Sequence, residues 1–324
     1  MNKSRVFYID FLRFVGLILI FLAHVEPPSL IFEIRNFDVS LMVFVSGLSC
    51  ALVQKNKGFT LSFNYIYYRA QRLILPVWIF LTFYFIVRCF FNELIIQEVV
   101  TSYLMISGIG YVWFMRVLIT FAIISPMIIY IEKKHGLFLV FILSLLGWLF
   151  NTLFFNIYGY NRLLDVIVFD WLGFIPLFAL GLYINNIKSK MLVFITATLF
   201  MVIVSFYWFY GDLNFQFFKY PPRGIYIIYG VLVSAILYLL VTQFVFFYDG
   251  KNKLITFVSK NSMWIYLLHI PLIRHFVFVF DCWMERFIIV CILSVVMVYL
   301  KNIIVTIVEK KTNTKNWFLS ALRG

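Results

Sequence analysis

The sequence predicts an all-α, polytopic membrane protein with about ten transmembrane helices and both termini in the cytoplasm. Three observations support this fold class: the composition, the lengths of the apolar runs and the placement of the basic residues. Of the 324 residues, 64% are hydrophobic and 13% are charged, and the mean hydropathy is +0.97. A soluble domain is about 45–50% apolar and about 25% charged. The composition therefore argues against an ordinary soluble domain.

The apolar runs define the predicted spans. A helix needs about 20 apolar residues to cross a hydrocarbon core of ~30 Å. Runs of this kind lie near residues 6–25, 37–54, 73–92, 111–131, 137–156, 166–185, 191–210, 224–248, 262–280 and 286–308. The first run follows two basic residues, as a signal peptide would, but its length and internal charges predict an uncleaved anchor. We expect a transmembrane domain over residues 1–310 and a short basic cytoplasmic tail over residues 311–324.

The basic residues alternate between the two sides of the membrane that these spans define. Most lysines and arginines fall in connections that are cytoplasmic if the N-terminus is cytoplasmic. Examples are the pairs Lys55 and Lys57, Lys133 and Lys134, Lys188 and Lys190, and Lys251 and Lys253. This distribution follows the positive-inside rule and predicts an even number of spans. The net charge of +13 therefore indicates contact with membrane lipids, and we expect no nucleic-acid partner.

The cysteines and histidines predict neither a metal site nor a disulfide framework. The four cysteines are Cys50, Cys89, Cys282 and Cys291, and no two of them form a CxxC pair. The histidines show no HxxxH or HExxH spacing. The sequence also lacks a Walker motif and a GxSxG elbow. We therefore expect no metal and no bound cofactor.

Three polar residues lie along one side of the first predicted helix. His24 follows Arg13 by eleven residues, which at about 100° per residue returns to within roughly 20° of the same direction. Asp10 precedes Arg13 by three residues and lies close to the same stripe. Charges in hydrocarbon are costly, so the stripe favours a functional site facing the bundle interior. An imidazole can accept a hydroxyl proton or carry an acyl group. The alternative is an interfacial histidine at the outer end of the helix.

Arg69 and Arg72 form a second polar feature, just before the predicted span 73–92. Two arginines three residues apart share a helix face. Their guanidinium groups can bind phosphate through two parallel hydrogen bonds. The pair is therefore a candidate site for a phosphorylated cytosolic molecule. The alternative is an ordinary membrane anchor in contact with lipid headgroups.

Three further residues are weaker candidates for a substrate path. Trp113 and Arg116 lie at the start of the span 111–131, where an arginine can pair with a partner or extend to the membrane surface. Arg223 ends a stiff, basic outer connection that begins at Lys219. This connection would meet an anionic or sugar-containing substrate, or would only fix the turn.

Tyr266 and His269 are candidates in the predicted span 262–280. Pro271 follows them and is expected to kink or break the helix, which would free backbone groups into a cavity. His269 taken alone is equally compatible with a packing or hydrogen-bonding histidine.

Taken in order, these segments resemble the integral-membrane acyltransferase 3 family of O-acyltransferases. The pattern Asp10-Phe-Leu-Arg13, followed by ten residues and His24, resembles the first-helix motif of that family. The other similar segments are Val43-Phe-Val-Ser46-Gly47 (a second-helix Ser-Gly motif), Arg69-Ala-Gln-Arg72-Leu-Ile-Leu-Pro76 (an RxxR-then-proline pattern), Val112-Trp-Phe-Met-Arg-Val-Leu with Ser125-Pro126 (a fourth-helix pattern) and Asn261-Ser-Met-Trp-Ile-Tyr-Leu-Leu-His269 (a late YxxH-like segment). Each motif is short, but together they follow the family order along most of the chain.

The resemblance implies an O-acetyltransferase of the bacterial inner membrane. Its donor would be cytosolic acyl-CoA, usually acetyl-CoA, as a co-substrate. Its acceptor would be a hydroxyl of O-antigen, capsule or exopolysaccharide, or of a lipid-linked sugar. Arg69 and Arg72 would then hold the CoA phosphates, and Ser46 would join the candidate substrate path.

Within that reaction, our mechanistic hypothesis assigns the chemistry to the first helix by the positions of its polar residues. His24 would act as a general base or carry the acyl group, while Asp10 and Arg13 would orient the reacting groups. His24 lies near the outer face and the arginine pair near the inner face, as much as ~25 Å apart. A deep cavity or a relay step is therefore required.

Two other classes of protein fit the composition. A transporter or flippase for lipid-linked sugar, without acyl chemistry, would also use intramembrane arginine and histidine and a proline-broken helix. A non-catalytic membrane scaffold explains the polar stripe less well. Acyl transfer is the predicted function and the flippase is its alternative, and the sequence predicts no particular oligomeric state.

Overall fold

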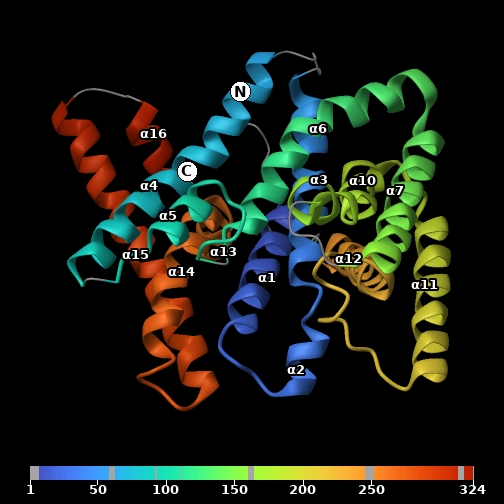
Figure 1. The fold of residues 1–324 in the computed structure, drawn as a ribbon. Helices are drawn as coiled ribbons and strands as arrows, with labels where there is room; N and C mark the ends of the chain where they lie inside the picture. Colours follow the sequence, from blue (N-terminus) through green and yellow to red (C-terminus); the bar gives the residue numbers. More distant parts are fainter. Residues whose placement is uncertain are drawn as a thin grey trace. The chain divides into compact units, whose positions relative to one another are not determined.

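The computed structural model is helical throughout its regular structure (Figure 1). It describes residues 7–57, 63–91, 93–109, 111–159, 164–244, 252–312 and 317–323. No strand occurs among these residues, so the all-α prediction is confirmed for the part of the chain that is described.

The helices follow one another along the whole chain. In the first half they are α1 (Phe7–Ala23), α2 (Ser29–Ile34), α3 (Asp38–Lys57), α4 (Phe63–Phe90), α5 (Ile96–Tyr103), α6 (Trp113–His135) and α7 (Leu137–Tyr158). In the second half they are η1 (Asp165–Phe169), α9 (Asp170–Leu172), α10 (Ile175–Tyr183), η2 (Ile184–Asn186), α11 (Ser189–Tyr210), α12 (Gly224–Phe244), α13 (Lys253–Lys260), α14 (Ser262–Phe276), α15 (Trp283–Thr312) and α16 (Trp317–Arg323).

Seven helical segments of the described chain are long and apolar enough to cross a membrane. An eighth arises if Asp165–Leu172 and Ile175–Asn186, which are bent by 43° at their junction, form one broken span. The two remaining predicted spans correspond to α1 and α14, whose helices have only 17 and 15 residues. The predicted number of spans and the cytoplasmic termini therefore stay predictions.

The described residues fall into two compact units. The first lies within Met1–Gly16, Pro28–Leu61 and Ile123–Asn252, and the second within Leu17–Pro27, Ser62–Ala122 and Lys253–Gly324. The boundaries fall inside α1 and α6, so each of these helices contributes to both units.

In the first unit, α3 and α10 cross at two glycines. A Cβ atom on Gly47 of α3 would lie 2.3 Å from the carbonyl oxygen of Phe178, and one on Gly181 of α10 would lie 2.0 Å from that of Phe44. Helices in membranes use small residues in this way to bring their backbones together. The crossing gives Gly47, next to Ser46, a packing role.

In the second unit, α14 packs along α15, and α16 packs against α15 and α4. The indole Nε1–H of Trp264 donates to the carbonyl oxygen of Ala321 at 3.1 Å. Lys301 lies 4.3 Å above the Trp264 ring and donates to the carbonyl oxygen of Leu322. The segment predicted as a tail thus contains a helix that packs on the unit.

Candidate functional site

His24 lies directly after the last residue of α1. Its backbone N–H donates to the carbonyl oxygen of Phe21 at 3.0 Å, which tightens the last turn of the helix. The half-buried imidazole meets the ring of Tyr111 edge-on, with the ring centroids 4.6 Å apart and the planes at 86°. It also lies beside the imidazole of His269, at a centroid distance of 5.7 Å. Two histidines far apart in the sequence thus share one environment.

His269 is fully buried within α14. Its ring stacks on Phe21 at a centroid distance of 4.5 Å. Its Nδ1 is hydrogen-bonded to the backbone carbonyl oxygen of Tyr266. A carbonyl oxygen can only accept, so this contact assigns the proton to Nδ1 and leaves a lone pair on Nε2.

The Nε2 atom of His269 is buried without a hydrogen-bond partner in the part of the chain that the structure describes. Buried polar atoms in native structures are nearly always paired, so an unpaired one calls for an explanation, which an ordered water, a bound molecule or a catalytic role can supply. An unprotonated imidazole nitrogen can accept a proton from a neighbouring group.

Tyr266 and Tyr111 complete the surroundings of the two imidazoles. The hydroxyl of Tyr266 donates to the backbone carbonyl oxygen of Tyr111 at 2.6 Å, and its ring lies 5.0 Å from that of His269. We call Phe21, His24, Tyr111, Tyr266 and His269 the histidine cluster. Its aromatic walls reduce the effective dielectric constant, which strengthens the interactions of any charge formed there.

Helix α14 brings two members of this cluster together because Tyr266 and His269 are three residues apart on one helix face. The helix continues through Pro271 to Phe276. Of the two outcomes expected at this proline, the break does not occur and the kink stays a prediction. Tyr266 and His269 lie in the helical turns before this proline. The His269 ring is hydrogen-bonded to the backbone carbonyl oxygen of Tyr266 within those turns.

Arg13 and Asp10 belong to the first unit, whereas the residues of the histidine cluster belong to the second. The Arg13 Nη2 donates to Ser49 Oγ on α3 at 2.6 Å, and Ser49 Oγ in turn donates to the carbonyl oxygen of Val45 at 2.8 Å. Asp10 is buried, and Ser46 is half-buried. The structure therefore ties Arg13 to the second predicted helix.

A family model described as an acyltransferase domain matches residues 6–304. The chain belongs to the acyltransferase 3 family. This membership confirms the resemblance given by the motifs, and it supports an integral-membrane acyltransferase. Neither the curated proteins nor the solved structures gave a significant match.

In this acyltransferase, the predicted phosphate-binding pair lies in the first part of α4. The Arg72 side chain is exposed. The Arg69 side chain lies outside the described residues, so the geometry of the pair stays a prediction.

Arg223, predicted on the substrate path, is the last residue of the connection between α11 and α12, and its side chain is buried. Its guanidinium lies 3.9 Å from the ring centre of Phe155, and its Nη1 donates to the carbonyl oxygen of Pro221 at 3.3 Å. Lys219 in the same connection is also buried, and its Nζ lies 2.8 Å from Asp38 Oδ1. Burial lowers the pKa of Lys219, and the Asp38 carboxylate opposes that shift. These contacts fix the turn.

Arg116 and Trp113 lie in the first turn of α6. The Arg116 Nη1 donates to the carbonyl oxygens of Met105 and, at 3.3 Å, Ile106. The ring of Trp113 contacts that of Phe114 edge-on. Arg116 thus binds the backbone of the segment before α6, which is the pairing alternative expected for this residue.

Sequence reasoning missed Tyr111, Phe21 and Ser49. Tyr111 directly precedes the Val112-Trp113 motif, and Phe21 lies one helical turn before His24, so their positions beside known motifs were the available signal. Ser49 lies one turn after Val45 on α3 and carried no signal of its own. Its partner Arg13 became evident only from the packing of α1 against α3.

Proposed function

We propose that this membrane acyltransferase transfers an acetyl group from cytosolic acetyl-CoA to a hydroxyl of a cell-surface polysaccharide or its lipid-linked precursor. We place it in the bacterial inner membrane with about ten spans and cytoplasmic termini. Family membership supports the reaction class. The observation that carries the proposal is the position of His24 against a second, buried imidazole with an unpaired nitrogen.

In the proposed reaction, the acceptor hydroxyl gives its proton to His24 as its oxygen attacks the thioester carbonyl carbon. The new C–O bond forms and the C–S bond breaks. The thiolate of CoA leaves and recovers the proton from the imidazolium. The products are an O-acetyl ester and free CoA, so atoms and charge balance. His269 accepts a hydrogen bond at Nε2 from the His24 imidazolium and thereby stabilises that cation until its proton passes to the thiolate.

The donor enters from the cytoplasmic side in this proposal. Arg69 and Arg72 bind the CoA phosphates, and the thioester arm reaches into the bundle. Asp10 and Arg13 orient the groups, with Arg13 available to stabilise charge on the thioester oxygen. The separation of the arginine pair from His24 is bridged by the length of the pantetheine arm or by an acyl-enzyme relay.

The reaction class is tested with inverted membrane vesicles that contain or lack the protein. The vesicles enclose envelope glycan or its lipid-linked precursor as acceptor and receive radiolabelled acetyl-CoA from outside, where the cytoplasmic face is exposed. Protein-dependent label in the glycan, released by mild alkali as acetate, supports the acyltransferase. Protein-dependent movement of the lipid-linked sugar without any labelled ester would instead support the flippase.

A further inference from the structure

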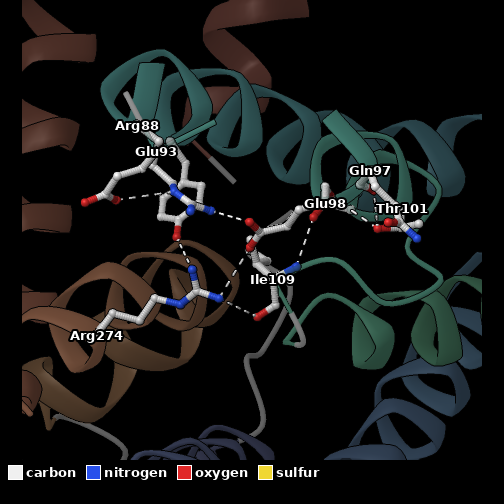
Figure 2. Close-up of polar contacts among 9 residues, drawn as sticks. Arg88, Glu93, Gln97, Glu98, Thr101, Ile109 and Arg274 are labelled. Atoms are coloured by element: carbon white, nitrogen blue, oxygen red, sulfur yellow. Dashed lines mark hydrogen bonds and ion pairs between the residues drawn. The ribbon is translucent and has the colours of Figure 1, made fainter. Parts of the chain in front are cut away.

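A half-buried carboxylate, that of Glu98, joins two arginines (Figure 2). Glu98 on α5 accepts a hydrogen bond at Oε2 from Arg88 Nη1 on α4. Its other oxygen, Oε1, lies 3.6 Å from Arg274 Nη2 on α14. A second acid, Glu93, pairs with Arg88, with its Oε2 lying 3.6 Å from Arg88 Nε. The side chain of Glu98 is 16% exposed and that of Glu93 is 64% exposed, so Glu98 is the central acid.

Arg274 connects this carboxylate to two further elements. Its Nη1 donates to the hydroxyl of Tyr84 on α4 at 2.6 Å. Its Nη2 donates to the backbone carbonyl oxygen of Ile109 at 3.4 Å, as Figure 2 shows. A guanidinium is a rigid, planar group of donors, so it fixes the relative positions of the groups that it binds.

Ile109 belongs to the connection between α5 and α6, residues 104–112, which we call the Tyr111 segment. Its described part is held at several points. The N–H of Ile109 donates to Ser102 Oγ at 3.0 Å. Gly108 adopts a positive φ of 58°, and a Cβ there would lie 1.9 Å from Ser102 Oγ, so only glycine fits. Arg116 binds the carbonyl oxygens of Met105 and Ile106 from the other end.

The Tyr111 segment ends at the histidine cluster. The ring of Tyr111 meets His24 edge-on, and its backbone carbonyl oxygen accepts the hydroxyl of Tyr266. The Tyr111 ring is therefore placed by a segment that Arg274 holds in position.

We propose that Arg274 and Glu98 are positioning residues for acyl transfer, which act through the Tyr111 segment on the orientation of the His24 imidazole. Glu98 holds the Arg274 guanidinium, Arg274 holds Ile109, and Tyr111 limits the rotation of His24. This inference rests on the proposed function of His24. It adds two residues that touch neither the donor nor the acceptor.

The test compares Arg274→Gln, Glu98→Gln, the double variant and the matched control Glu93→Gln in acetyl-CoA-dependent acetyl transfer. A catalytic group misplaced by about 1 Å can lose on the order of 100-fold in rate, so we expect kcat to fall by about 10- to 100-fold in both single variants. The KM for acetyl-CoA should stay within about twofold, because the phosphates bind elsewhere. The double variant should lose no more than Arg274→Gln, because the two residues act through one contact. Glu93→Gln should match the wild type.

A second readout separates this inference from the proposed function. Diethyl pyrocarbonate modifies accessible imidazoles, and mass spectrometry follows the modification of His24. Its rate should rise severalfold in Arg274→Gln and Glu98→Gln but not in Glu93→Gln. If the wild type transfers no acetyl group and these rates still differ, the proposed function fails and the positioning role stands.

Two results would overturn the positioning role. One is that Arg274→Gln and Glu98→Gln melt at the wild-type temperature, retain the wild-type kcat and show an unchanged rate of His24 modification. The other is that the fold-loss of kcat in the double variant equals the product of the fold-losses in the two single variants. Glu98→Gln is isosteric and carries the test by itself if Arg274→Gln does not accumulate.

Discussion

The two imidazoles of the histidine cluster differ in how firmly they are held. His269 is fixed by its Nδ1 contact with Tyr266 and by stacking on Phe21. His24 lies after the end of α1 and is bordered by rings. The motifs identified each histidine separately. The proximity of the two imidazoles could not be predicted, because it depends on how α1 packs against α14. No local pattern in the sequence determines that packing.

The role of His269 is tested by a pair of substitutions. Asparagine places an amide N–H near the position of Nδ1, so His269→Asn keeps the hydrogen bond to Tyr266 and removes the Nε2 lone pair. If Nε2 takes part in proton transfer, His269→Asn and His269→Ala should both reduce kcat by about 10²- to 10⁴-fold. The measurement is steady-state acetyl transfer at matched protein levels. Retained activity in His269→Asn would leave His269 with a packing role only.

At the scale of the elements, the sequence predicted most helices within a few residues because long apolar runs leave little choice in a membrane. It did not predict the break between α9 and α10, which lies inside an apolar run, or the helix α5, which is too short to form a run of spanning length. Helix α14 also continues without a break through Pro271, where the sequence predicted a kink or a break within the span 262–280. Neighbouring helices can satisfy the backbone group that a proline leaves unpaired.

The crossing of α3 and α10 gives a prediction for a single glycine. In Gly47→Ala, the new Cβ would meet the backbone oxygen of Phe178, so the two helices must move apart, at a cost of about 1–3 kcal/mol or more. In the matched control Gly147→Ala, the new Cβ would meet the flexible end of Leu172 at 3.0 Å. Thermal unfolding in detergent should show a clear loss for Gly47→Ala and little change for Gly147→Ala. Equal melting temperatures would contradict the close crossing.

At the scale of the whole molecule, composition and charge distribution predicted the class of protein, and the family model confirmed the family. The division into two compact units was not predicted, because its boundaries fall inside α1 and α6, where the sequence shows no linker. The two predicted spans that correspond to α1 and α14 have the shortest helices, so the predicted topology depends on them.

Topology is tested with single cysteines on either side of α14, in a chain whose four native cysteines are replaced. Asn252→Cys should react with a membrane-impermeant maleimide only from the cytoplasmic side, and Asp281→Cys only from the outer side. This outcome follows if α14 spans the membrane and completes an even number of spans. Labelling of both positions from the same side would remove α14 from the spans and change the predicted location of the C-terminus.

The central claim is that the His24 imidazole takes part in acyl transfer. It is tested most directly by the rate at which label passes from radiolabelled acetyl-CoA into envelope glycan, in membranes with wild-type protein, His24→Ala or the control Glu93→Gln at matched levels. General acid–base catalysis contributes about 10²- to 10⁴-fold, so label should appear with the wild type and with Glu93→Gln and fall by that factor with His24→Ala. Equal rates for all three proteins would contradict the claim and remove His24 from the chemistry.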